Sequence, residues 1–168
     1  KAEAQARESE IQLALERIRA RSMAMQSSEE LREVVQVMYD QVDKLGIAKW
    51  GCLLLIFDKA KPNVQGWFSE IVHARHPKPF DFDNKDHEII QKWWDYWESD
   101  EEILSIHLKD KEKHEFARYL FTKTGFKNLP DEVKTAIMNE PEVYFEYTNM
   151  EFGLIEFIDI DPFPEDSI

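Results

Sequence analysis

The sequence predicts an α+β domain with a central antiparallel sheet, flanking helices and a long N-terminal helix. Three observations predict this fold. Residues 1–26 contain neither Gly nor Pro and consist mostly of good helix formers. An unbroken apolar strand follows at 50–57, and apolar residues alternate along 103–108 and in a closing pair of strands at 143–147 and 152–158. Segments with helical spacing separate these strands, which favours an α+β arrangement.

The N-terminal helix carries a narrow apolar stripe of the heptad type. Its members recur at alternating steps of three and four residues, or at their sum of seven: Ala4, Ile11, Leu15, Ile18, Ser22 and Met25. A narrow stripe flanked by charges cannot bury a whole helix against its own domain, so we expect a homodimer through this helix. A helix lying on its own domain is the alternative. The stripe divides the chain into a connecting helix at 1–27 and a globular domain at 28–168.

A second helix is predicted to follow the connecting helix closely. Ser27 and Glu30 have the spacing of a capping box, and apolar residues at helical spacing continue as far as Gly46, a residue typical of helix C-termini. The two helices are expected to run on almost continuously through 22–30. The strand at 50–57 is apolar on both faces, which predicts a central position in the sheet.

The middle of the chain alternates between strands and helices. Turn residues at 62–66 predict a hairpin between the strand at 50–57 and a strand at 67–75. A break at 76–79 precedes a helix at 86–97.

The last part of the chain begins with the strand at 103–108, which places Leu104, Ile106 and Leu108 on one face. Helices are expected at 110–124, closed by Gly125, and at 130–139. The closing hairpin is expected to turn at 148–151, and the residues from 159 to 167 to be frayed.

Composition excludes several classes of function. The chain has 168 residues, with 34 acidic against 21 basic side chains and a net charge of −13, so nucleic acid and anionic membranes are poor partners. The longest apolar run, 52–57, is too short to cross a membrane. A single cysteine excludes an internal disulfide framework and a multi-cysteine zinc site. Because the sequence starts at Lys1 rather than Met, we expect it to be part of a longer protein.

One stretch resembles a known family. The segment 15–26, LERIRARSMAMQ, together with Ser28, Glu29, Glu30 and Leu31, resembles the start of GAF-like sensor domains in bacterial multidomain signalling proteins, above all sensor histidine kinases. The strand after Gly46 and the closing strand at 152–157 are similar to the first and last strands of such domains. The resemblance implies a cytoplasmic sensory module with a GAF/PAS-like sheet. It also implies terminal helices on one face of the sheet, a ligand pocket on the other and an adjacent output domain.

The sequence lacks motifs of catalysis. It contains no G-x-x-x-x-G-K-S/T, G-x-G-x-x-G, G-x-S-x-G or H-E-x-x-H pattern, and its five glycines are too few for glycine-rich nucleotide loops. We therefore expect no enzymatic activity from this chain, even if the full-length protein is a histidine kinase.

The resemblance also implies an exit helix after the last strand, which the sequence does not contain.

Aromatic residues supply the candidate ligand pocket. Four of them crowd the helix at 86–97 and cannot all face one core, so some must line a cavity, cover an edge or sit at an interface. A cavity lined by such rings could bind a small-molecule effector. The predicted pocket residues are Trp67, Arg75, Trp93, Trp94, Trp97, His107, Arg118 and Tyr119. No cofactor is identified. Structural packing alone is the alternative, in which case the domain is a ligand-free dimerisation spacer with a degenerate pocket.

The remaining chemistry-bearing residues predict no metal site. His73, His76 and His87 lie near the carboxylates of Asp81, Asp83 and Asp86, but their spacing matches no known ligand pattern. The run 81–86 lacks the central Gly and final Glu of a calcium loop. Cys52 is expected to be a buried, inert thiol. His107 is a candidate axial haem ligand by its place on the polar face of its strand, but an ordinary polar contact is the favoured interpretation.

Overall fold

The computed structural model describes residues 2–24, 30–47, 50–61, 63–71, 74–75 and 79–163, and confirms the α+β class. Its helices are α1 (Ala2–Ala24), α2 (Leu31–Lys44), α3 (Glu88–Trp97), α4 (Asp110–Lys123) and α5 (Asp131–Asn139), with a 3-10 helix η2 (Gly125–Asn128) after α4. Its strands are β1 (Gly51–Phe57), β2 (Asn63–Ile71), β3 (Ala74–Arg75), β4 (Phe80–Asp83), β5 (Ile103–Lys109), β6 (Glu142–Met150) and β7 (Gly153–Asp159).

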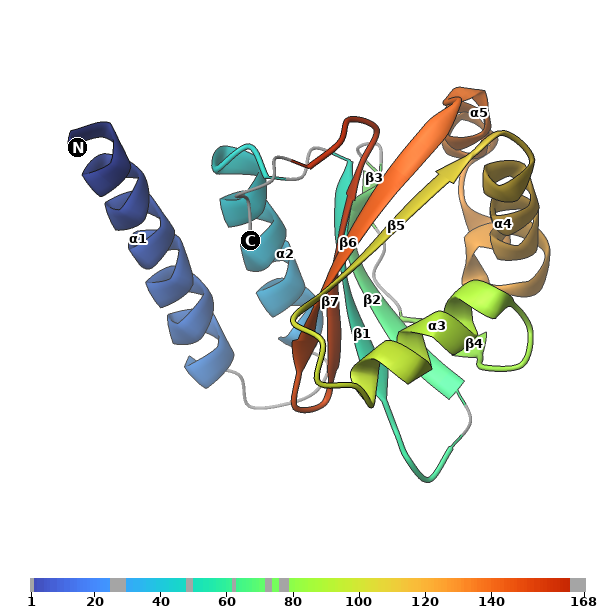
Figure 1. The fold of residues 1–168 in the computed structure, drawn as a ribbon, viewed down its shortest axis with the longest axis horizontal. Helices are drawn as coiled ribbons and strands as arrows, with labels where there is room; N and C mark the ends of the chain where they lie inside the picture. Colours follow the sequence, from blue (N-terminus) through green and yellow to red (C-terminus); the bar gives the residue numbers. More distant parts are fainter. Residues whose placement is uncertain are drawn as a thin grey trace.

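The described strands form one antiparallel sheet in the order β3-β2-β1-β7-β6-β5, with β4 also paired to β2 (Figure 1). Strand β1 lies between β2 and β7, so the predicted central position is confirmed. Its alternate residues enter two separate cores. Leu53 and Leu55 face the core beneath α3, α4 and α5, while Cys52 and Leu54 face the core beneath α2. A strand covered on both faces needs the unbroken apolar run that the sequence shows.

Helix α2 covers one face of the sheet with its apolar side, where Val35, Met38 and Val42 are buried. It ends in a Schellman motif, which confirms the predicted cap. Gly46 adopts a φ of 67°, and its N–H donates to Asp43 O at 2.9 Å, while Ile47 N–H donates to Val42 O at 3.1 Å. The predicted start of the capping box, Ser27, lies outside the described residues.

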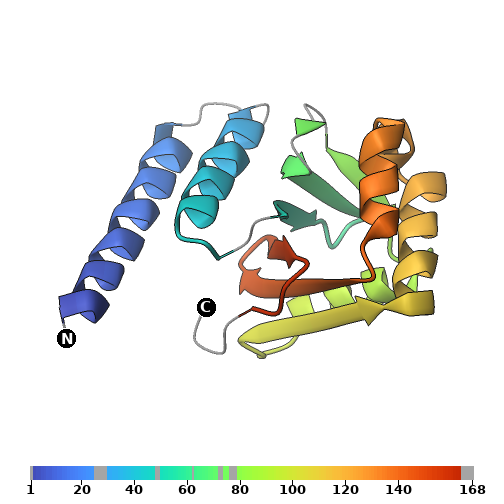
Figure 2. The same cartoon turned by 90° about the horizontal axis from the view of Figure 1, so that it is seen from above.

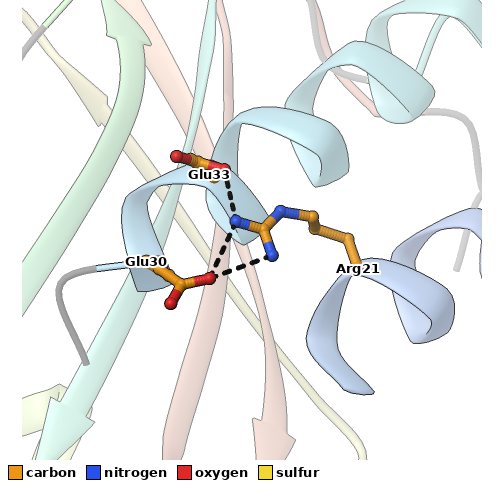
Figure 3. Close-up of polar contacts among 3 residues, drawn as sticks. All are labelled: Arg21, Glu30 and Glu33. Atoms are coloured by element: carbon orange, nitrogen blue, oxygen red, sulfur yellow. Dashed lines mark hydrogen bonds and ion pairs between the residues drawn. The ribbon is translucent and has the colours of Figure 1, made fainter. Parts of the chain in front are cut away.

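Helix α1 forms an outer layer on α2 rather than continuing into it. Figure 2 shows α1 outermost, then α2, then the sheet, with α4 and α5 beyond it. The two helices are antiparallel. Arg7 Nη1 donates to Leu45 O at 3.0 Å at one end. At the other end, Arg21 donates to both Glu30 and Glu33 (Figure 3).

The prediction of an almost continuous helix through 22–30 is therefore wrong. Glu30 and Glu33 place two carboxylates at the N-terminus of α2, where they offset the positive end of the helix dipole and bind the Arg21 guanidinium. This contact requires the chain to reverse direction between the two helices.

The heptad stripe of α1 is divided between two environments. Ala14, which is not part of the stripe, is buried at 6% exposure, and Ile11 and Ile18 are half-buried beside it. Leu15 retains 40% exposure on the other side of the stripe. One side of α1 therefore packs on its own domain, as in the alternative interpretation. The side chains of Ala4 and Ser22, and all of Met25, lie outside what is described.

The turn before β2 falls earlier than predicted. It runs from Asp58 to Lys61, where the Asp58 carbonyl accepts from Lys61 N–H at 2.8 Å. The predicted turn residue Gly66 lies inside β2. A Cβ at Gly66 would lie 2.6 Å from the Phe82 ring, so the glycine allows a neighbouring strand to pack closely. That neighbour is β4, which sequence reasoning missed.

The closing hairpin is confirmed, with a tighter turn than predicted. Met150 pairs with Gly153, which leaves only Glu151 and Phe152 in the loop. Asp159, expected to be frayed, is instead buried as the last residue of β7, where its Oδ1 accepts from the N–H groups of Ile160 and Asp161. This capping of the following backbone is the physical reason for its order.

Candidate functional site: a cavity between the sheet and α4

A cavity of ≈ 70 Å³ lies between the sheet and the helices on the face opposite α2. We call it the central cavity. Its lining residues come from every layer of that side: Trp50, Leu53, Phe68, Phe82, Trp93, Lys113, Phe116, Ala117, Leu120, Phe126, Ile137, Glu140, Val143, Phe145, Glu156 and Ile158. An apolar cavity with a few polar groups is the usual form of a small-molecule site.

The periodicity of the elements explains this lining. Helix α4 contributes Lys113, Phe116, Ala117 and Leu120, which follow the spacing of one helical face. The strands contribute every second residue, as in Val143 and Phe145 of β6 or Glu156 and Ile158 of β7, because alternate side chains point to one face of the sheet.

Glu156 and Trp93 of the cavity lining meet a third polar residue, Tyr147, which is not itself part of the lining. Glu156, on β7, is only 3% exposed and lies opposite Tyr147 of β6 in the sheet register. Trp93 of α3 packs over them, with its ring centroid 6.0 Å from that of Tyr147. We call these three residues the polar cluster. Within the described chain, Glu156 Oε2, Tyr147 OH and Trp93 Nε1 have no hydrogen-bond partner.

Burial dominates the electrostatics of the polar cluster. It raises the pKa of the Glu156 carboxyl to about 8, because a charge is poorly solvated there. The nearby Tyr147 hydroxyl offsets part of this rise, although its position does not meet hydrogen-bond geometry. Burial also raises the pKa of Tyr147. A carboxyl that is mostly protonated at neutral pH, set in a cavity, is a recognised mark of a functional site.

Lys113 is the basic residue of the cavity wall. It is 3% exposed, and its ammonium group donates to the carbonyl of Ile137. Burial lowers the pKa of Lys113, while the negative charge of Glu140 acts in the opposite direction. The acidic neighbour that acts on this ammonium is therefore Glu140, at the start of the connection to β6, and not Glu156.

The cavity reaches solvent on the side of α5. Among its lining residues, Trp50, Leu120, Ile137 and Glu140 remain partly exposed, whereas the polar cluster is fully buried. A ligand would thus enter between α4 and the connection after α5, and end against the polar cluster.

Of the predicted pocket residues, Trp93 lines the central cavity. Trp67 lies on the other face of the sheet, where it packs against the core under α2 and its Nε1 donates to Gln65 Oε1 at 3.2 Å. The neighbouring residue Phe68 takes the cavity-facing position instead. Since consecutive strand residues point to opposite faces, Trp67 and Trp93 cannot share one pocket.

The other two tryptophans of α3 cover an edge of the core. Trp94 packs edge-on against Phe57 with ring centroids 4.9 Å apart, and Trp97 stacks on the same ring at 4.7 Å. Trp97 Nε1 donates to Met150 O at 3.2 Å. Packing therefore accounts for these two residues.

The remaining predicted residues are dispersed. Tyr119 is buried beside His87, and burial raises its pKa to about 12, with smaller contributions from Asp86 and Asp83. His107 lies on the surface of β5, where its Nε2 is 2.8 Å from Glu142 Oε2 and its ring stacks on Tyr144 at 4.1 Å.

The two predicted pocket arginines lie elsewhere. Arg118 is exposed on α4, and the Arg75 side chain lies outside the described residues. The structure does not gather the eight predicted pocket residues into one site.

The structure describes one of the three histidines that were candidate metal ligands. His87 caps α3, with its Nδ1 accepting from Ile89 N–H at 3.2 Å, and His73 and His76 are outside the described residues. The described residues contain no group of three or more His, Cys, Asp or Glu side chains arranged to hold a metal ion. Cys52 is fully buried, as predicted, and burial raises the pKa of its thiol.

Sequence reasoning missed Glu156 and Lys113, the two most buried charged residues of the cavity wall. A signal for Glu156 was present. It interrupts an otherwise apolar segment, Gly153 to Ile158, in a strand that the resemblance places inside a sheet, and a carboxyl in such a strand has no solvated face.

None of the helices in the described ranges combines the length and the apolar character needed to span a bilayer. The chain was also compared with known proteins, and no family model, curated protein or solved structure matches it.

Proposed function

We propose that this chain is a GAF-like sensory module of a cytoplasmic signal-transduction protein of the sensor histidine kinase type, which binds a small molecule in the central cavity. The segment 15–31 supports the family assignment through its resemblance to the start of such domains. A module of this kind has no catalytic role of its own, and it would pass its signal to an adjacent output domain through its terminal helices.

The observation that carries this proposal is the polar cluster at the end of the apolar cavity. Each buried polar atom without a partner costs about 1–3 kcal/mol, and three of them lie together. Native proteins keep few such atoms, and a bound ligand is one reason to keep them. A ligand that pairs with the Glu156 carboxyl would bind in one orientation, with the rest of the molecule against Phe116, Phe126 and the other aromatic walls.

A thermal-shift screen of metabolites tests the proposal. A ligand at ten times its Kd contributes about 1.4 kcal/mol, which corresponds to a rise in melting temperature of about 3–6 °C for a chain of this size. The matched control is Ala117→Leu, because Ala117 lies in the cavity wall on α4 and a leucine there fills the space. A true cavity ligand stabilises the wild type and fails to stabilise the filled variant.

The absence of any such ligand would favour the second candidate, a ligand-free dimerisation spacer. The exposure of Leu15 on α1 favours this candidate, since this residue belongs to the heptad stripe and is 40% exposed. Burial of an exposed leucine stabilises by about 1.5–3 kcal/mol, so a second copy of the helix is a suitable partner for it.

Homodimerisation through α1 is part of both candidates, and sedimentation tests it. We expect Leu15→Glu to dissociate a dimer while leaving the α1–α2 contact in place, because Leu15 points away from Ala14. An exposed substitution on the same helix, Glu16→Gln, is the control. A wild-type chain that sediments as a monomer at tens of micromolar would contradict dimerisation.

A further inference from the structure

The polar cluster restricts the chemistry of what can bind in the central cavity. An ionised carboxylate can only accept hydrogen bonds, whereas Tyr147 can donate or accept and Trp93 can only donate. Burial also raises the pKa of the Glu156 carboxyl to about 8. The Tyr147 hydroxyl lies near this carboxyl, but its Oε2 has no partner in hydrogen-bond geometry among the described residues, so a bound ligand could donate to it.

The charges around the cavity leave Glu156 without a countercharge in the described chain. Lys113 on α4 is influenced by Glu140, so these two charges offset each other. Strand β6 presents the hydroxyl of Tyr147, α3 presents the indole of Trp93, and on the opposite face of β1 the Cys52 thiol stays neutral, since burial and the charge of Glu156 raise its pKa. With Glu156 ionised, the cavity holds one net negative charge, which a monovalent cation would neutralise.

The walls of the cavity suit an organic cation rather than a hydrated ion. Phe68, Phe82, Phe116, Phe126 and Phe145 supply five of the sixteen lining residues, and aromatic faces attract organic cations and apolar chains alike. A cavity of about 150 Å³ holds a benzene molecule, so the ≈ 70 Å³ here holds a head group of about three or four non-hydrogen atoms. The remainder of a larger ligand would extend past Ile137 towards solvent.

From these contacts we propose that the central cavity binds a compact organic cation of the primary alkylamine type, whose ammonium group pairs with the Glu156 carboxylate. This inference rests on the proposed function, because it names the ligand class of the same cavity. The ligand enters as an ammonium ion, and the Glu156 carboxyl releases its proton to solvent as the ion pair forms. Binding is therefore coupled to the release of one proton below the pKa of this carboxyl.

The test compares three probes of equal length: n-butylamine, n-butanol and butanoate, which are a cation, a neutral molecule and an anion at neutral pH. Calorimetric titrations of the wild-type chain are made at pH 6, 7 and 8. Each is repeated in buffers of different ionisation enthalpy, which counts the protons released. We expect butylamine to bind about 50-fold more tightly at pH 8 than at pH 6, with about one proton released at pH 7. Butanol and butanoate are expected to bind at least tenfold more weakly at pH 8.

Glu156→Gln is the informative variant, because the amide keeps the shape of the side chain but cannot ionise. We expect it to lose the pH dependence and at least tenfold of the butylamine affinity. Glu151→Gln, on the exposed turn between β6 and β7, is the control and should leave binding unchanged. The pH series and the proton count need only the wild-type chain, so they decide the matter even if the variant folds poorly.

Other outcomes separate this inference from the proposed function. If butanol binds as tightly as butylamine and without proton release, Glu156 acts as a neutral donor and the cation is refuted, while the ligand-binding function stands. If another metabolite stabilises the wild type but not Ala117→Leu, and butylamine does not bind, the cation is likewise refuted alone. If neither butylamine nor any metabolite binds, the proposed function fails with it.

Discussion

The burial of Glu156 makes a prediction about stability that needs no ligand. Its pKa of about 8 in the folded chain exceeds the ordinary value of 4.5 that it recovers on unfolding. Below pH 4.5 the carboxyl is protonated in both states and has no effect on the pH dependence. Between these values the folded state holds a proton that the unfolded state does not, so the free energy of unfolding falls as the pH rises.

The magnitude follows from the interval between the two pKa values. The loss is about 1.4 kcal/mol for each pH unit, which gives about 3 kcal/mol at pH 7 and about 5 kcal/mol once the pH exceeds 8. Glu156→Gln removes this loss, because the amide stays neutral in both states. The variant should therefore be about as stable as the wild type at pH 4.5 and more stable by about 3 kcal/mol at pH 7.

Urea unfolding followed by tryptophan fluorescence measures this difference at several pH values. Taking the difference between the variant and the wild type cancels the contributions of the other carboxyls. Glu151→Gln, whose side chain is exposed, is the control variant. A difference for Glu156→Gln that is constant from pH 4.5 to pH 8 would refute the burial of an unsatisfied carboxyl at this position.

Two further predictions concern the packing of the strands and of helix α1. Gly153→Ala should cost about 3 kcal/mol or more of unfolding free energy, because its Cβ would lie 1.8 Å from the carbonyl oxygen of Leu55. Gly46→Ala should cost only about 1 kcal/mol, because a Cβ there meets open space and only the φ of 67° is unfavourable. Urea unfolding measures both variants, and a similar loss of unfolding free energy in Gly153→Ala and Gly46→Ala would contradict the strand packing. Ala14→Glu should expose the amides of α1 to hydrogen exchange, whereas Leu15→Glu should not, since Ala14 is buried and Leu15 is not. Equal hydrogen exchange in the two variants would contradict the packing of α1 on its own domain through Ala14.

Much of the fold could be predicted because its elements have clear periodicity. The alternation along β5 placed Ile106 and Leu108 inside and His107 outside, and the structure agrees. The central position of β1 followed from its two apolar faces. The antiparallel reversal of α1 could not be predicted in the same way, because it depends on contacts of Arg21 with residues on another helix. Helical propensity alone does not distinguish a bend from a continuous helix.

Strand β4 illustrates a limit of reading short segments. Its four residues, between Pro79 and a turn rich in Asp and Asn, have the composition of a loop. The strand depends on long-range contacts: Phe80 and Phe82 are buried, and Phe82 packs over Gly66 of β2. Such a strand is stabilised by its neighbours and not by its own propensity.

Little of the candidate site could be predicted from the sequence. Aromatic residues line the cavity, and Trp93 is the one predicted pocket residue among them. Composition could not say which tryptophan faces which core, because this depends on the register of each element. The residue that most distinguishes the cavity, Glu156, looks like an ordinary acidic side chain in a chain with many of them. Only the packing around it shows its burial.

The Glu156 carboxyl is the proposed binding group of the central cavity. The most direct measurement is a pH titration of its ¹³C chemical shift, made with and without saturating butylamine. We predict an apparent pKa of about 8 for the chain alone and a value well below this when the amine is bound. A carboxyl that titrates near its ordinary value of 4.5 in the folded chain would contradict the burial. A pKa that butylamine leaves unchanged would contradict the ion pair.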